Sequence, residues 1–208
     1  MAIIHKATLT PSKPEVLRGW LDRQPWGGSG EIEQVAGYRF DNPAGEVGVE
    51  GFVLRRGDRL LHAVLTYRGE PQRDGQGLIA TMQHSVLGRR WVYDAATDPV
   101  ALGCFLRAVR GEQDQAALEL WDGDRRTGLR EQTLRLLAQD GSGPDTPDGY
   151  DGPDRQDEFA NPDASTVVRV AIDGGELRIA RVLGIPVDGS RRLTARWDGG
   201  SAVLAALR

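Results

Sequence analysis

The 208-residue chain is poor in the features that mark secreted, membrane and metal-binding proteins. Cys104 is its single cysteine, which excludes an internal disulfide framework. No apolar run approaches the roughly 18 to 20 residues of a membrane span, and the first residues contain Lys6 and Lys13 but no apolar signal segment. No cluster of Cys or His indicates a metal site. We therefore expect a cytoplasmic globular protein with no cofactor and no membrane contact.

Basic charge is also limited. The chain has 26 basic and 30 acidic residues, and Lys6 and Lys13 are its only lysines. The segment 140–163 has eight acidic residues against Arg155 alone, without the ligand spacing of an EF-type calcium loop. No basic cluster interleaved with aromatic residues is present, so we expect no nucleic-acid partner. The acidic segment, rich in Asp, Gly and Pro, is expected to be a flexible linker.

The first half of the chain predicts an α+β fold. A strand is expected over 3–10, followed by a helix that Ser12 and Glu15 begin as a capping box and that ends near 23. Asp98 and Pro99 begin a second helix, which ends at Gly111. Turn residues bound the strands expected between the two helices: 32–40, 46–56, 59–67, 78–86 and 91–93.

The second half predicts mainly strands. Asp-Gly-Gly turns at 173–175 and 198–200 indicate hairpins. Strands are expected at 117–121, 133–138, 166–172, 176–183, 192–197 and 202–207. The last four would form a small antiparallel sheet that packs on the first part, since it cannot bury a face alone. We expect four parts: 1–111, connecting strands in 112–139, the linker 140–163, and the C-terminal strands in 164–208.

Four stretches carry a resemblance to a known family. They are 1–13 with His5-Lys6, the Gly-containing stretch 42–50, the stretch 64–71 with Tyr67-Arg68-Gly69, and 84–99 from His84 to Pro99. Together they resemble the N-terminal cap of maltokinases and related sugar kinases, over about residues 1–111. The resemblance implies a curved antiparallel sheet with packing helices, similar to cystatins. It also implies a setting in maltose, trehalose and α-glucan metabolism, and it transfers no catalytic residue.

The chain lacks the parts a kinase needs. Both lysines lie within the first 13 residues, no G-x-x-x-x-G-K-[ST] motif occurs, and no Asp-Phe-Gly is present. The chain also stops at Arg208, before the catalytic lobe of such enzymes. The stretch from Gly75 to Ala80 matches G-x-G-x-x-[GA], but it leads into a strand, which indicates a hairpin turn and no dinucleotide site. We expect no kinase activity and no catalytic residue.

Five residues within eleven positions are the best candidates for a ligand site. They combine an imidazole, a carboxylate and two guanidinium groups, and the guanidinium groups could bind a phosphate or a carboxylate group. The candidates are His84, Arg89, Arg90, Tyr93 and Asp94. The alternative is structural: Arg89 and Arg90 point to opposite faces of a strand, one of them pairs with Asp94 or Glu50, and His84 is half buried.

Two tryptophans are further candidates. Trp26 lies beside Gly27 and Gly28, and Trp121 lies beside Asp122, so both are expected to be exposed and able to stack on a sugar. Three functions stay open. The first is a non-catalytic cap-like protein that docks onto a maltokinase-type kinase or another α-glucan enzyme. The second is a module that binds a sugar, a sugar phosphate or an α-glucan, and the third is an enzyme with an unrecognised site at 84–94.

Overall fold

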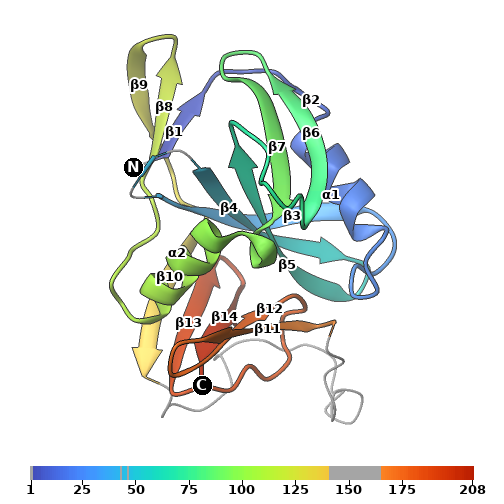
Figure 1. Ribbon diagram of the computed structural model, residues 1–208, viewed down its shortest axis with the longest axis vertical. Coiled ribbons are helices and arrows are strands. Elements are labelled where there is room, and N and C mark those ends of the chain that lie inside the picture. Colours follow the sequence, from blue (N-terminus) through green and yellow to red (C-terminus); the bar gives the residue numbers. More distant parts are fainter. Residues whose placement is uncertain (1, 43, 46, 141–164) are drawn as a thin grey trace.

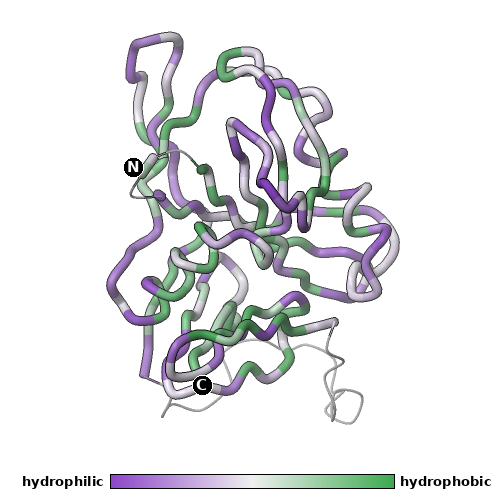
Figure 2. Tube along the Cα trace, viewed as in Figure 1, coloured by the Kyte–Doolittle hydropathy of each residue, from purple (hydrophilic) through white to green (hydrophobic). Residues whose placement is uncertain are grey.

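The computed structural model describes residues 2–42, 44–45, 47–140 and 165–208. The described part contains two α-helices and three β-sheets (Figure 1), which confirms the α+β class. Figure 2 shows that apolar residues follow the strands and helices of the interior, whereas the outer loops are mostly hydrophilic. No helix among these residues is long and apolar enough to cross a membrane.

The largest sheet has six antiparallel strands and curls into a half-barrel (Figure 1). Their spatial order is β2-β6-β7-β5-β4-β3. The bounds are β2 (Leu9–Thr10), β3 (Ile32–Phe40), β4 (Val47–Arg56), β5 (Arg59–Arg68), β6 (Leu78–His84) and β7 (Gly88–Asp94). The loop over Gly75 to Gly77 does enter a strand, but it is not a hairpin, because β5 pairs with β7 and not with β6.

Helix α1 (Lys13–Leu21) begins with the expected capping box. The Ser12 side chain accepts from the backbone of Glu15, and the Glu15 carboxylate accepts from the Ser12 backbone at 2.8 Å. The buried stripe is Val16, Leu17, Trp20 and Leu21. This stripe packs into the core, and the helix places Lys13 over the sheet beside β4 and β5.

Helix α2 (Pro99–Val109) follows a short 3₁₀ turn, η1 (Ala95–Thr97). Asp98 caps it as expected by accepting from the Val100 backbone at 2.9 Å. The same buried carboxylate accepts from Thr66 and Arg68 of β5, each at 2.7 Å. A single residue thus begins the helix and fastens it to the half-barrel.

The second sheet has five antiparallel strands in the order β10-β13-β14-β12-β11. The bounds are β10 (Leu134–Asp140), β11 (Val167–Ile172), β12 (Gly175–Ala180), β13 (Arg191–Trp197) and β14 (Gly200–Leu207). Both Asp-Gly-Gly hairpins are confirmed. The sheet contains β10 as an edge strand in addition to the four strands expected. It therefore joins residues from both sides of the boundary that was expected at 140. Residues 141–163 of the expected linker lie outside the described residues.

The two large sheets share one hydrophobic core. Helix α2 contacts β10, β13 and β14, and its Phe105 ring lies edge-on to Phe40 of β3 with centroids 5.5 Å apart. Where β7 diverges from β5, the segment after β12 takes its place. His62 donates its backbone N–H to the Arg181 carbonyl at 2.9 Å, and Leu183 donates to Leu60 at 2.8 Å. The C-terminal strands are therefore continuous with the half-barrel.

The third sheet has three strands, ordered β1-β8-β9: β1 (Ala2–His5), β8 (Leu118–Asp122) and β9 (Arg125–Arg130). Its β8–β9 hairpin projects from the body (Figure 1). The single strand expected over 3–10 is split, because β1 pairs in parallel with β8 while β2 pairs with β6. Strand β9 was not predicted from the sequence, because its residues are mostly polar.

Candidate functional site

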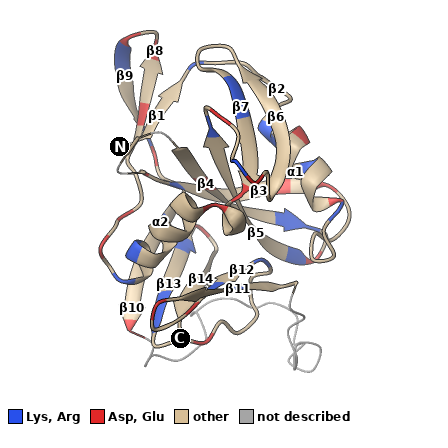
Figure 3. Ribbon diagram, viewed as in Figure 1, with Lys and Arg blue, Asp and Glu red and all other residues tan. Residues whose placement is uncertain are grey.

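A group of polar side chains meets on the α1-covered face of the half-barrel. Alternation along the strands brings them to one face: Arg39 lies opposite Glu50, Gly48 lies opposite Tyr67, and Arg90 lies opposite Met82 in the pairing. We define this polar cluster as His5, Lys13, Arg39, Glu50, Tyr67, His84 and Arg90. Part of the cluster comes from β7 and α1, and Figure 3 shows the charged residues on both elements.

Lys13 and Glu50 form the centre of the polar cluster. The Lys13 ammonium donates to both Glu50 carboxylate oxygens, at 2.9 and 2.6 Å, and lies 5.4 Å from the centre of the Tyr67 ring. Burial alone would raise the pKa of Glu50, but Lys13 and the Arg39 guanidinium together hold that pKa below its ordinary value. Glu50 is therefore a carboxylate, and Lys13 already neutralises it.

Arg39 and Tyr67 occupy the space beside Gly48. An ideal Cβ at Gly48 would lie 2.7 Å from Arg39 Nη2, so a larger residue there would require the guanidinium to shift. Arg39 Nε and the Tyr67 hydroxyl are both buried; the hydroxyl interacts with the Glu50 carboxylate, whereas Arg39 Nε has no hydrogen-bond partner among the described residues. Burial, and then the Glu50 charge, raise the pKa of Tyr67 well above its ordinary value. The hydroxyl thus keeps its proton and remains a donor.

Arg90 and His84 form the other side of the polar cluster, on β7 and β6. Arg90 donates through Nη2 to the Leu87 carbonyl at 2.7 Å, while its Nε is buried without a partner among the described residues. His84 Nδ1 accepts from the backbone of Val86 and Leu87 at 3.2 and 3.1 Å, which closes the hairpin turn. Burial lowers the pKa of His84, followed by the fields of His5, Arg90 and Lys13.

The polar cluster has more positive charge than its own groups neutralise. Among the described residues of the cluster, Glu50 is the one acidic side chain beside Lys13, Arg39 and Arg90. Three buried side-chain nitrogens of the cluster have no hydrogen-bond partner in the described part of the chain: His5 Nδ1, Arg39 Nε and Arg90 Nε. Since buried polar groups are nearly always paired in native proteins, this concentration marks the cluster as a candidate binding site. The two arginine nitrogens are hydrogen-bond donors, so the cluster favours an acceptor as its ligand.

Two of the predicted site residues, His84 and Arg90, lie in the polar cluster. Arg89 points to the opposite face of β7, where its guanidinium lies 6.0 Å from the centre of the Trp91 ring. The pairing expected for one of these arginines is wrong, because Asp94 pairs with Arg181 and Glu50 pairs with Lys13. The two arginines do face opposite ways, as the structural alternative predicted.

Tyr93, Asp94 and Trp26 are used in packing. The buried Tyr93 hydroxyl accepts from the Gln72 backbone at 2.8 Å, and Asp94 caps η1 while it pairs with the buried Arg181 guanidinium at 2.5 Å. The expectation that Trp26 is exposed is wrong: it is 5% exposed and lies 5.1 Å from the Arg181 guanidinium. No free ring face remains there for a sugar.

Trp121 lies on the projecting sheet, away from Trp26. It is partly exposed and donates from Nε1 to Glu119 at 3.2 Å. With Ile4 and Leu120 it lines a cavity of about 330 Å³, which His5 also lines. Trp121 therefore remains available for ligand contact.

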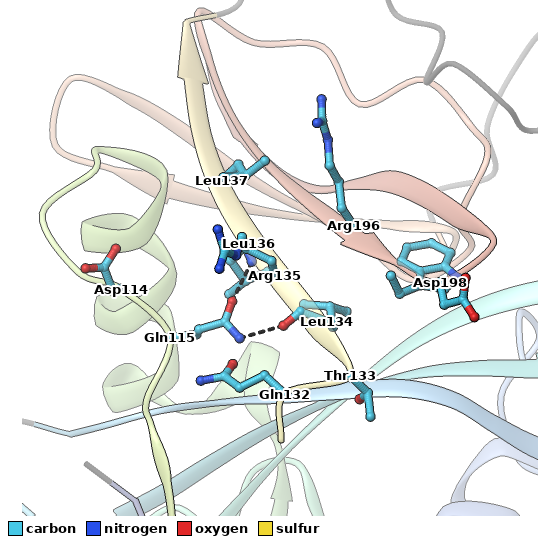
Figure 4. A pocket seen from close by; sticks show the side chains of 11 residues that line it. Asp114, Gln115, Gln132, Thr133, Leu134, Arg135, Leu136, Leu137, Arg196 and Asp198 are labelled. Carbon is cyan, nitrogen blue, oxygen red and sulfur yellow. Dashed lines mark hydrogen bonds between the residues drawn. The ribbon is translucent and has the colours of Figure 1, made fainter. Parts of the chain in front are cut away.

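A wider cavity of about 620 Å³ lies along the outer edge of β10 (Figure 4). The Gln115 side chain spans this edge by donating to the Leu134 carbonyl and accepting from the Leu136 backbone, as a neighbouring strand would. Its charged side chains balance, since two arginines and two aspartates line it. The Gln115 side chain therefore occupies the backbone hydrogen-bonding groups of this sheet edge. The cavity also lacks the surplus of positive charge found in the polar cluster.

Five members of the polar cluster were not predicted from the sequence: His5, Lys13, Arg39, Glu50 and Tyr67. They come from four separate elements and the start of a helix, so no local spacing joins them. A signal did exist. Each of the four stretches that carry the cap resemblance contributes at least one member: His5 and Lys13, Glu50, Tyr67, and His84 with Arg90.

Comparison with known proteins agrees with that resemblance. Residues 20–98 match the model of the maltokinase N-terminal cap domain, a span that runs from the end of α1 through η1 and so includes β3 to β7. Neither the curated proteins nor the solved structures contain a match. The chain thus contains a maltokinase cap-like domain. Within the described ranges, no group of three or more His, Cys, Asp or Glu residues could hold a metal ion.

Proposed function

We propose that this protein is a non-catalytic cap-like module that docks onto a partner enzyme. The partner is a maltokinase-type sugar kinase of maltose, trehalose and α-glucan metabolism, which places the complex in the cytoplasm. The match of residues 20–98 to the maltokinase cap domain carries the proposal. The matched name describes a domain at the N-terminus of a kinase, so a kinase is the natural partner to propose for this cap-like chain.

One end of the molecule supports the proposal with an apolar surface. Val86 and Leu87, at the tip of the β6–β7 hairpin, are 52% and 45% exposed. Ile3 of β1 and Leu129 of β9 are also exposed, and both lie in register with Glu119 of β8, so they share one face of the small sheet. We call these four residues the apolar end.

The elements that carry the two parts of the apolar end contact each other. Ser85, next to the hairpin tip, exchanges hydrogen bonds with Thr8, both at 3.0 Å. The His5 and His84 rings are 6.0 Å apart. Clustered apolar side chains on a soluble surface mark contact sites more often than scattered ones do. The apolar end is therefore the surface we assign to the kinase.

The experiment mixes the purified protein with a purified maltokinase-type kinase at concentrations on the order of 10 µM, and measures complex formation by size-exclusion chromatography and calorimetry. A Val86→Asp/Leu87→Asp variant should lose the complex, because two charges would be desolvated at the contact. Leu78→Asp is the matched control, since Leu78 is 47% exposed at the far end of β6. No complex with the wild-type protein, or equal loss in the control, would refute the proposal.

A further inference from the structure

We propose that the polar cluster binds a phosphate-type oxyanion, such as the phosphate group of a phosphorylated sugar. The inference is separate from docking, because it concerns the α1-covered face of the half-barrel and not the apolar end. It rests on three observations: unpartnered buried donors, a surplus of positive charge, and donors that approach from different elements.

Two buried guanidinium nitrogens of the polar cluster can take an acceptor. Arg39 Nε and Arg90 Nε each have a hydrogen to donate and are buried without an acceptor among the described residues. The Glu50 carboxylate accepts from Lys13 through both oxygens and interacts with the Tyr67 hydroxyl. An oxyanion with several acceptor oxygens would satisfy both arginine nitrogens.

The charge of the polar cluster requires the same kind of ligand. Three cationic side chains face one carboxylate, which leaves a surplus of two positive charges in partly buried surroundings. Desolvated cations are costly unless they are paired. A dianion should therefore bind here with a more favourable free energy than on an open surface. A neutral sugar would leave the surplus unchanged, so the charged group is the part recognised.

The donors come from three strands of one sheet. Arg39 lies on β3, Tyr67 on β5 and Arg90 on β7, and their side chains share the α1-covered face. Tyr67 pairs with Val92, and Arg90 lies two residues from Val92 on the same face of the sheet. Such diagonal neighbours, here Tyr67 and Arg90, have Cα atoms roughly 7 to 8 Å apart. One anion between long side chains can bridge that separation. Access is available at Lys13, whose side chain is 32% exposed.

The test uses inorganic phosphate, glucose 1-phosphate, glucose and maltose as probes, each at matched ionic strength in sodium chloride. Calorimetry and the shift in Tm measure binding. We expect saturable binding of phosphate and glucose 1-phosphate, and none of glucose or maltose. Tighter binding of glucose 1-phosphate than of phosphate would identify a sugar phosphate as the ligand, and equal binding would identify free phosphate. Both outcomes support an oxyanion site, whereas no saturable phosphate binding overturns it.

Two adjacent arginines provide a matched pair of variants. Arg90→Gln should weaken phosphate binding about tenfold or more, because it removes a charged donor. Arg89→Gln, with the same change on the opposite face of β7, should leave binding unchanged. Tyr67→Phe keeps the ring and removes only the hydroxyl, so it should also weaken binding if it folds with an unchanged circular dichroism spectrum. Equal effects of Arg89→Gln and Arg90→Gln would overturn the assignment.

Discussion

The buried His62 side chain makes the stability of this protein depend on pH in a predictable way. Its Nδ1 lies 2.9 Å from the Ala180 carbonyl, which can only accept, so Nδ1 carries the proton. Nε2 then accepts from the Tyr38 hydroxyl at 2.9 Å. Burial, opposed by the hydrogen bond to Ala180 and aided by the Arg181 charge, lowers the pKa of His62 to about 3. The fold thus requires the neutral imidazole.

The sign and size of the effect follow from this pKa. An unfolded His62 has the ordinary pKa of about 6.5 and binds a proton there, while the folded one does not. The contribution of His62 to the free energy of unfolding is therefore fully present above about pH 6.5, and it is lost as the pH drops toward 3. Between about pH 7.5 and pH 5 the free energy of unfolding falls by roughly 2 kcal/mol because of His62 alone, since His62 becomes protonated in the unfolded protein but not in the folded one. Most carboxylates stay ionised over that interval.

Urea unfolding followed by tryptophan fluorescence measures the effect across this pH interval. His62→Gln is the informative variant, because its amide can donate to Ala180 and accept from Tyr38 but does not titrate. Between pH 7.5 and pH 5 this variant should lose about 2 kcal/mol less of its free energy of unfolding than the wild-type protein, and should keep only the loss from other groups such as His84, whose pKa is also lowered. His5→Gln leaves His62 in place and should keep the loss. Equal losses in His62→Gln and the wild-type protein would refute the reasoning.

Three further predictions concern the junctions of the fold. Asp98→Ala removes the cap of α2 and the bonds that its buried carboxylate accepts from Thr66 and Arg68, so the free energy of unfolding in urea should fall by about 3 kcal/mol or more. Gly51→Ala should be destabilising by several kcal/mol, since its Cβ would lie 2.2 Å from the Tyr38 ring, whereas the control Gly128→Ala has open space and should change thermal stability little. Arg181→Gln breaks the buried pair with Asp94 and should cost about 3 kcal/mol and alter tryptophan fluorescence.

The parts of the fold that depend on neighbouring residues could be predicted from the sequence. The Ser12–Glu15 capping box and the Asp98–Pro99 helix start are local hydrogen-bond patterns. The Asp-Gly-Gly hairpins are local in the same sense, and they fix the strands on either side of them. The cap resemblance is confirmed over residues 20–98, while its cystatin-like likeness and the role of the acidic segment remain predictions.

The parts that depend on distant residues could not be predicted. Trp26 appears exposed beside two glycines, but Arg181, far along the chain, covers it. Asp94 appears free to pair with Arg89 or Arg90, yet the same Arg181 takes it. The polar cluster is the clearest case, since its members come from separate elements that only the curled sheet brings together. Sequence spacing therefore found His84 and Arg90 but not the residues that surround them.

The central claim is that this chain is a cap-like module that docks onto a sugar kinase through the apolar end. The most direct measurement is calorimetric titration of the purified protein into a purified maltokinase-type kinase, with the Val86→Asp/Leu87→Asp and Leu78→Asp variants in parallel. We predict a saturable complex for the wild-type protein and Leu78→Asp, and none for the double variant. Absence of heat and of co-elution with the wild-type protein at concentrations on the order of 10 µM would contradict the claim.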